Sequence, residues 1–287
     1  MIAPRCSDRQ VEPLPGSAKR ESVFVVYEHP HRWSRDVLDG ATFGPELTAR
    51  LKSALKGRAG LQLIRRPGRE GRLVDRPHLY IVHCASATTE LLRVDGPEAI
   101  LDLDLEAPLA NGGESVTDPL LLVCTHGKRD LCCAVKGRPL AASLADGPSG
   151  PFVWETSHTK GHRFAPAMLL LPWGYSYGQL NAPATASLLE HARAGEYFLP
   201  GNRGSGLFDS AGQVAELAVA QTLLEAGERL RFGELSATGG EVTHIDGRCW
   251  HVDMDREYVD GAIASCGKAP KTAKVLVARS VTATDFG

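Results

Sequence analysis

Two short blocks of cysteine and histidine constrain the fold of this 287-residue chain more than any other feature. The first block, CTHGKRDLCC, separates Cys124 from Cys133 by eight residues, and the second, HTKGH, separates His158 from His162 by three. Two thiolates and two imidazoles make a four-ligand set for zinc, or for a [2Fe-2S] cluster in which two histidines replace two cysteines. The spacing alone leaves both kinds of centre open.

Apolar runs place both blocks at the ends of predicted strands. The run LLLVC predicts a short buried strand over residues 120–124, and FVWET predicts another over residues 152–156. The two histidines follow the second strand in a loop, because Gly161 and the nearby Pro166 disfavour a helix. A regular helix is expected from Pro139 to Ala145, since proline is favoured in a first helical turn.

The rest of the chain predicts a mixture of strands and helices. Before the first block, the sequence predicts an amphipathic helix over residues 44–56. It also predicts five strands, over residues 21–29, 61–66, 78–86, 89–94 and 99–105. After the second block, residues 183–195 and 211–227 read as helices, the Gly-rich LPGNRGSGLF as a connector, and the last sixty residues as short strands.

These elements predict an α+β protein with three parts. Residues 1–115 form an N-terminal mixed α/β unit, residues 116–195 carry the ligand blocks, and residues 196–287 supply a helix and a β-rich C-terminal region. The first boundary falls in ANGGESVTDP, residues 110–119, whose glycine, serine and proline content is typical of a linker.

Composition excludes several classes of protein. The formal net charge of −2 gives no reason to expect nucleic acid or an anionic membrane as a partner. No apolar run is long enough for a membrane span, and the polar N-terminus predicts a cytoplasmic protein. The seven scattered cysteines argue against a disulfide scaffold.

Local charge around the ligand blocks is positive. This leaves two interpretations, a solvated basic face or a docking surface for a redox partner protein with an acidic surface. The basic residues are Lys128, Arg129, Lys136, Arg138, Lys160 and Arg163, opposed nearby by Asp130 and Glu155.

The blocks CTHGKRDLCCAVKGRPLAASL and VWETSHTKGHRFAPAMLLLPWGYSYGQL closely resemble the sucrase/ferredoxin-like family. The resemblance implies a thioredoxin-like ferredoxin domain around residues 116–195 and a [2Fe-2S] cluster. Its ligands would be Cys124, Cys133, His158 and His162. The chain departs from the family's HxGGH motif at Lys160, where glycine is usual, and Cys132 is a second candidate beside Cys133.

The predicted function is that of an iron-sulfur electron-transfer or redox-sensing protein, an electron carrier rather than a catalyst with its own substrate. Neutral histidine ligands make the cluster easier to reduce than four thiolates would, and they allow reduction to be coupled to proton uptake. The alternatives are a structural zinc protein with the same four ligands, and a thiol oxidoreductase that uses Cys132 and Cys133. No pair of carboxylates indicates glycoside hydrolysis.

Overall fold

The computed structural model describes residues 5–284, apart from the side chain of Glu70. The described chain divides into two compact units. The first, which we call the sheet unit, consists of Glu21–Thr159 and Met168–Gly174. The second, which we call the ribbon unit, consists of the described residues up to Arg20, Lys160–Ala167, and the described residues from Tyr175 onward.

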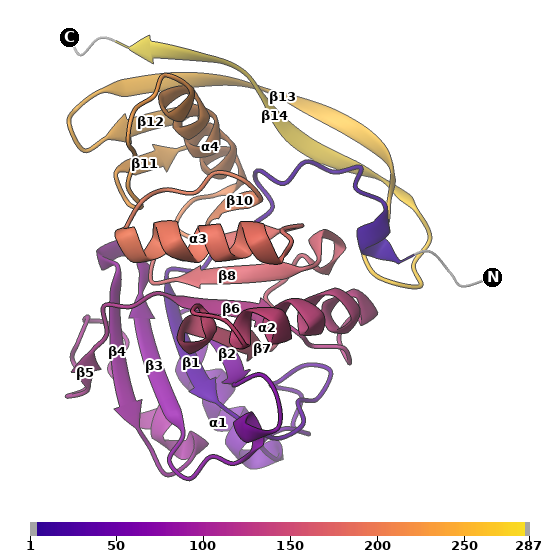
Figure 1. Cartoon of the computed structure of the whole chain (residues 1–287), viewed down its shortest axis with the longest axis vertical. Helices are drawn as coiled ribbons and strands as arrows, with labels where there is room; N and C mark the ends of the chain where they lie inside the picture. The colour runs from indigo at the N-terminus through magenta and orange to yellow at the C-terminus, as the bar shows by residue number, and fades with distance from the viewer. Residues whose placement is uncertain (1–4, 285–287) are drawn as a thin grey trace. The chain divides into compact units, whose positions relative to one another are not determined.

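A mixed sheet forms the centre of the sheet unit, with the strand order β8-β6-β7-β2-β1-β3-β4-β5 (Figure 1). The pairs β6–β7 and β1–β2 are parallel, and the other neighbours are antiparallel. The strands are β1 (Val23–Glu28), β2 (Gly60–Arg65), β3 (His78–His83), β4 (Thr88–Arg93), β5 (Glu114–Ser115), β6 (Leu120–Cys124), β7 (Val153–Thr156) and β8 (Ala167–Leu171).

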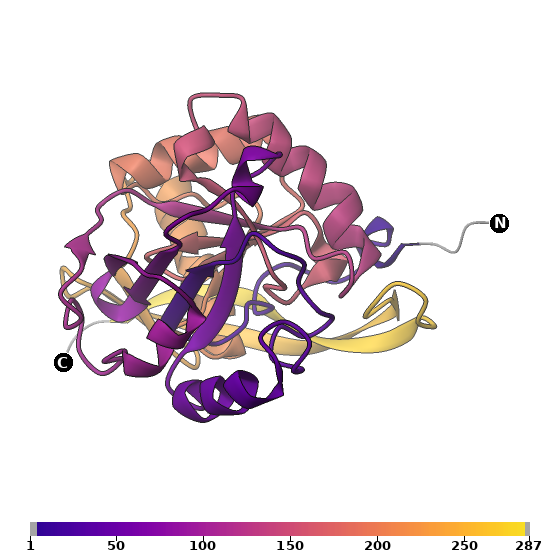
Figure 2. The ribbon, with the colours of Figure 1, turned by 90° about the horizontal axis from the view of Figure 1, so that it is seen from below.

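Helices cover this sheet on both faces. Helix α1 (Pro45–Leu55) buries Leu51 and Leu55 against Val25 and Leu63 of the sheet. Helix α2 (Arg138–Ala145) contacts β6 and β7, and Figure 2 shows α1 and α2 on opposite sides of the strands. Alternate strand residues point to opposite faces, so strands covered on both sides become almost wholly buried, as β6 is.

The ribbon unit is built on antiparallel strands and two helices. Strands β9 (Tyr175–Gly178) and β10 (Asn202–Ser205) pair with each other. A second sheet has the order β11-β12-β13-β14, formed by Leu235–Thr238, Glu241–His244, Cys249–Ala262 and Lys271–Thr284. Helix α4 (Ser210–Glu225) packs on that sheet, and α3 (Ala182–Ala194) begins at the Asn181 side chain, which accepts from Ala184 N–H.

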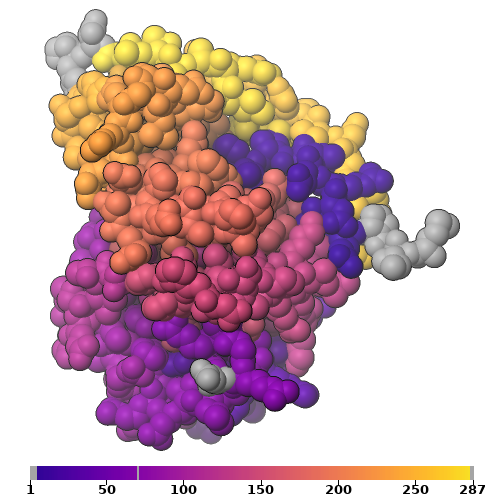
Figure 3. Space-filling view, viewed as in Figure 1, coloured from indigo at the N-terminus to yellow at the C-terminus, as the bar shows by residue number. Residues whose placement is uncertain are grey.

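The N-terminal arm packs against the C-terminal ribbon within this unit. A cavity of about 320 Å³ is lined by Glu12 and Ser17 of the arm and by Arg256 and Lys274 of the ribbon. Figure 3 shows the indigo arm beside the yellow ribbon. The arm is therefore part of a packed unit and not a free extension.

Shorter helical turns connect the main elements. The single π-helix is Cys133–Gly137 within the described residues. The 3₁₀ turns are Cys6–Asp8, Glu70–Arg72, Cys84–Ser86, Pro97–Asp102, Gly150–Phe152 and His162–Phe164. No helix in residues 5–284 is both long enough and apolar enough to cross a membrane.

The observed elements confirm an α+β protein and correct two local predictions. The strand expected over residues 99–105 is wrong: residues 99–102 belong to a 3₁₀ helix, Pro97–Asp102, that begins with proline and buries Ile100, and residues 103–105 are not in a strand. The Gly-rich connector contains strand β10, whose four residues are all buried. The two compact units are discontinuous in sequence, and the predicted parts 1–115, 116–195 and 196–287 stay a prediction.

Candidate metal centre

Parallel pairing of β6 and β7 brings the two ligand blocks toward one another. Cys124 is the last residue of β6 and lies opposite Thr156, the last residue of β7. His158 follows two residues later, and the backbone N–H of Thr125 donates to Thr156 O at 3.1 Å. The carboxyl ends of parallel strands share one edge of a sheet, so both candidate ligands meet there.

Cys133 reaches the same edge from the loop after β6. One ligand atom from each of Cys124, Cys133 and His158 lies within 4.8 Å of the other two. Both cysteines are fully buried, whereas His158 is partly exposed. The Cys124 Sγ atom lies 4.0 Å from His158 Nδ1. We call these three residues the Cys/His cluster.

Asp130 positions the backbone that carries Cys133. Its carboxylate accepts from Cys132 N–H at 2.9 Å, and its carbonyl oxygen accepts from Cys133 N–H at 3.2 Å. An aspartate that accepts from the N–H groups at the start of a helix acts as a cap. The D-x-x-C spacing is the sequence signal that could have identified this role.

A hydrogen bond between the two buried thiols shifts their pKa values in opposite directions. Donation from the Cys133 thiol lowers the pKa of Cys124 well below its usual value, and the His158 side chain acts in the same direction against the effect of burial. The same hydrogen bond, together with burial, raises the pKa of Cys133. The site therefore favours one anionic sulfur, the form in which cysteine binds metals.

Gly137 allows helical residues after Cys133 to approach β6 closely. A Cβ atom at this position would lie 2.1 Å from the carbonyl oxygen of Cys124. Any larger side chain must push the strand end away from the helix. The sequence contains many glycines, and only the structure identifies this one as part of the site.

His126 holds the loop between the two cysteines from the side. Its Nε2 atom lies 2.7 Å from the carbonyl oxygen of Ser34, and its ring packs edge-on against Trp33. Burial lowers the pKa of His126, which favours the neutral ring. No spacing rule indicates this contact, because the partners are 92 residues apart.

The fourth candidate ligand, His162, belongs to the ribbon unit. Its Nε2 atom lies 2.6 Å from the carbonyl oxygen of Ala264. Gly161 before it has φ = 86°, and a Cβ atom there would lie 2.3 Å from the guanidinium of Arg203. Glycine is therefore required at residue 161 for both conformation and space.

Lys160 adopts the left-handed conformation that glycine favours. Its φ is 65°, although it carries a side chain. A non-glycine residue in this region costs about 1 kcal/mol. Lys160→Gly is therefore expected to raise the free energy of unfolding by at most about 0.5 kcal/mol, since the greater entropy of glycine in the unfolded chain offsets roughly 0.5–1 kcal/mol of the gain. Lys160→Ala, which keeps Cβ, should give no such gain in urea denaturation; equal gains in both variants would contradict the backbone explanation.

A second pair of thiols lies in the ribbon unit. Cys266 Sγ lies 3.6 Å from Cys6 Sγ. This contact between two thiols lies where the N-terminal arm meets the turn between β13 and β14. Nothing in the sequence indicates this proximity, since the two residues are 260 positions apart.

The candidate ligands lie in a region of the chain that matches a known protein family. A family model described as sucrase/ferredoxin-like matches residues 14–204, more than half of the chain. The chain belongs to the sucrase/ferredoxin-like family. Comparisons with curated proteins and with solved structures found no match. The Cys/His cluster lies wholly within the part of the chain that the sucrase/ferredoxin-like model covers.

The donor atoms of the Cys/His cluster fit a metal that prefers sulfur and nitrogen. Two cysteine sulfurs and one imidazole suit zinc or an iron-sulfur cluster better than magnesium or calcium, which prefer oxygen. Cys132 is fully buried beside Cys133, yet its sulfur is not grouped with Cys124 and His158 in the described residues. In this member of the sucrase/ferredoxin-like family, Cys133 is therefore the better-placed candidate.

Proposed function

We propose that the chain is an electron-transfer or redox-sensing protein that holds one [2Fe-2S] cluster, with reduction coupled to proton uptake. Its ligands would be Cys124, Cys133, His158 and His162. The observation that carries the proposal is the Cys/His cluster within the matched sucrase/ferredoxin-like region. A zinc centre on the same residues is the second candidate, because the donor atoms suit both.

The surroundings of the candidate ligands support a redox role. When bound, a [2Fe-2S] cluster supplies one-electron chemistry at a potential set by its ligands and their surroundings. The two buried cysteines exclude water from the sulfur side, while the partly exposed His158 offers an edge toward solvent. Such an arrangement would shield the thiolates from solvent and leave a short path for an electron between the cluster and the protein surface at His158.

A basic hollow beside Cys124 supports an acidic partner. A cavity of about 240 Å³ is lined by Arg32, Thr125, Lys128 and Arg138. Arg65 also lines it, but Glu155 neutralises that guanidinium in a buried ion pair at 2.7 Å. The other three cations remain to attract carboxylates on a redox partner, and their effect should weaken as salt is added.

The absorption spectrum of protein purified without oxygen tests the proposal directly. A [2Fe-2S] protein is expected to be coloured, to bleach on reduction, and to contain two irons and two sulfides per chain by analysis. A colourless, redox-silent protein with one zinc per chain would instead establish the structural alternative.

Exchange of one imidazole for a thiolate tests histidine ligation. His158→Cys is expected to retain a cluster and lower its reduction potential, because an anionic ligand replaces a neutral one and disfavours the added electron. Protein-film voltammetry measures the shift. His126→Gln is the matched control, since His126 lies in the loop between the two cysteines but its ring is bonded to Ser34. The reduction potential of the His126→Gln variant should move much less. An unchanged potential in His158→Cys would exclude His158 as a ligand.

A further inference from the structure

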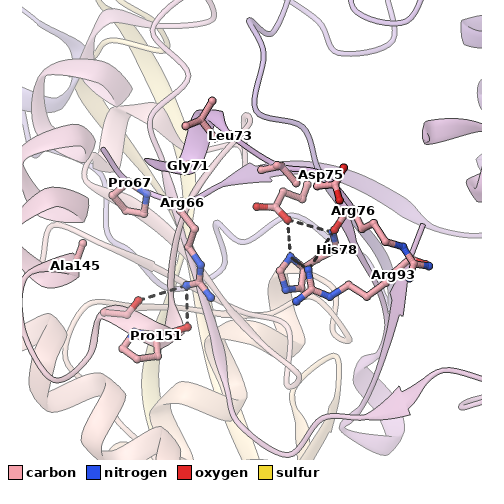
Figure 4. A pocket seen from close by; sticks show the side chains of 13 residues that line it. Arg66, Pro67, Gly71, Leu73, Asp75, Arg76, His78, Arg93, Ala145 and Pro151 are labelled. Atoms are coloured by element: carbon pink, nitrogen blue, oxygen red, sulfur yellow. Dashed lines mark hydrogen bonds and ion pairs between the residues drawn. The ribbon is translucent and has the colours of Figure 1, made fainter. Parts of the chain in front are cut away.

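A cavity of about 680 Å³ in the sheet unit carries a concentration of positive charge (Figure 4). Three arginines, Arg66, Arg76 and Arg93, line it together with His78. Pockets of this size are typical of small-molecule sites. The Cys/His cluster contributes no residue to this cavity.

Arg66 is held on one side of the cavity by its surroundings. Its guanidinium stacks on the ring of Trp154 at 3.7 Å, and its Nη1 atom donates to the carbonyl oxygens of Pro151 (2.8 Å) and Val153 (3.2 Å). These contacts fix the plane of the guanidinium and engage only Nη1. The edge formed by Nε and Nη2 has no hydrogen bond to a described residue, and that edge can bind two oxygens at once.

Arg93 presents a second guanidinium from the opposite side of the cavity, as Figure 4 shows. Its Nη1 atom donates to the carbonyl oxygen of Arg76 at 3.2 Å and lies 3.2 Å from His78 Nδ1. His78 Nδ1 also lies 2.5 Å from Glu28 Oε2. The proton on Nδ1 is therefore directed to the Glu28 carboxylate, and Nδ1 cannot accept a hydrogen bond from Arg93. The Nε and Nη2 edge of Arg93 is likewise without a bond to the described residues.

The carboxylates near the cavity do not neutralise these two arginines. Glu28 is buried and bonded to both the ring and the backbone N–H of His78. Asp95, almost fully exposed, lies 3.9 Å from Arg76, and Asp75 is an exposed residue of the lining. Neither Arg66 nor Arg93 has an ion pair with a carboxylate among the described residues.

The positive charges also act on each other. Burial is the main effect that lowers the pKa of Arg66; Tyr80 and Glu28 oppose it, and the charge of Arg93 lowers the pKa by a smaller amount. An anion placed between the two guanidinium groups would remove this repulsion and satisfy both unused edges. A tetrahedral phosphate offers enough oxygens for two guanidinium forks, whereas one carboxylate fills only one.

An apolar wall completes the cavity. Pro67, Leu73, Val74 and Pro151 line it, and the side chain of Leu73 is 88% exposed. A large exposed leucine beside paired arginines suits a ligand with a charged end and an apolar body. We propose that this cavity binds an organic phosphate, with the phosphate between Arg66 and Arg93 and the organic part against Leu73 and Val74.

Calorimetric titration of the full chain with three probes tests the proposal. Phenyl phosphate has both recognised parts, inorganic phosphate lacks the apolar body, and benzoate lacks the phosphate. We expect saturable binding of phenyl phosphate that is about tenfold tighter than that of either other probe. Its affinity should also fall as salt is added.

Variants assign the binding to these residues. Arg93→Gln should weaken phenyl phosphate at least about tenfold, the loss expected for one bidentate guanidinium contact. Arg50→Gln, which removes the same charge from the exposed face of α1, should leave the affinity within about twofold. Leu73→Ser should weaken phenyl phosphate but not inorganic phosphate. Arg93 and Leu73 are both exposed, so these variants should fold normally.

Three results would overturn the proposal. The first is no saturable binding of phenyl phosphate, and the second is equal weakening by Arg93→Gln and Arg50→Gln, which would indicate nonspecific attraction. The third is inorganic phosphate binding as tightly as phenyl phosphate, which would leave the apolar wall without a role. None of these results depends on whether the chain holds an iron-sulfur cluster.

Discussion

Replacing Cys124 or Cys133 with serine is expected to abolish cluster assembly. Both side chains are fully buried and grouped with His158, and serine cannot supply the thiolate that either metal centre requires. The visible absorption and the iron content of each variant should fall to background after anaerobic reconstitution. Circular dichroism should remain close to that of the wild-type apoprotein, because the replacement is nearly isosteric.

Cys132→Ser is the matched control for this experiment. Cys132 precedes Cys133, is equally buried and undergoes the same chemical change, but its sulfur is not grouped with Cys124 and His158. Its variant should retain the full absorption spectrum. Loss of the spectrum in Cys132→Ser with retention in Cys133→Ser would transfer the ligand role to Cys132.

Glu216→Gln is expected to stabilise the chain at alkaline pH and to have little effect in acid. Glu216 is completely buried in α4, where Tyr175 and Tyr197 donate to Oε1 at 2.8 and 2.7 Å, while Oε2 has no hydrogen-bond partner. Burial raises the pKa of Glu216 to about 7, against the opposing effect of the two tyrosine hydrogen bonds. The folded chain therefore favours the protonated carboxyl group.

The sign of the pH dependence follows from this raised pKa. Stability from protonated Glu216 is fully present below the unfolded value of 4.5 and is lost as pH rises through about 7. The difference corresponds to about 3 kcal/mol in the free energy of unfolding. The tyrosines that face Glu216, including Tyr177, do not titrate in this window, because burial raises their pKa values further.

Urea denaturation at pH 5, 7 and 8.5 measures the effect. The advantage of Glu216→Gln over wild type should grow from about 1 kcal/mol or less at pH 5 to about 3 kcal/mol at pH 8.5. Glu225→Gln, an exposed position on the same helix, should follow the wild-type curve. Parallel curves for wild type and Glu216→Gln would show that Glu216 remains ionised in the fold.

Sequence patterns identified most helices and strands because their apolar residues recur with a clear period. The helix at α1 and the strands β1, β2 and β6 fall within a residue or two of their expected positions. The strand predicted over residues 99–105 was wrong, because Ile100 and its neighbours mimic the alternation of a strand while Pro97 starts a 3₁₀ helix that runs to Asp102. Strand β10 was missed because its glycine and polar residues resemble a loop, although Arg203 is fully buried there.

The sequence predicted strand ends beside Cys124 and His158 and grouped both residues as candidate ligands, whereas the parallel pairing that brings them to one edge is seen only in the structure. Other functional features escaped sequence reasoning for a common physical reason. Glutamate is normally exposed, so nothing in the sequence marks Glu216 as a buried residue. The cavity arginines likewise lie on separate strands and loops, and only the sheet brings Arg66 and Arg93 to one cavity.

Cys124 and His158 become neighbours only after β6 and β7 have paired, and that pairing closes a loop over residues 125–152. On its other side β6 pairs with β8, which is made later in synthesis. Contacts between distant parts of a chain form slowly, because the entropy of loop closure is lost before packing compensates for it. The proposed ligand set is therefore assembled only once β6 and β7 have paired, and we expect metal incorporation to follow folding of these strands rather than direct it.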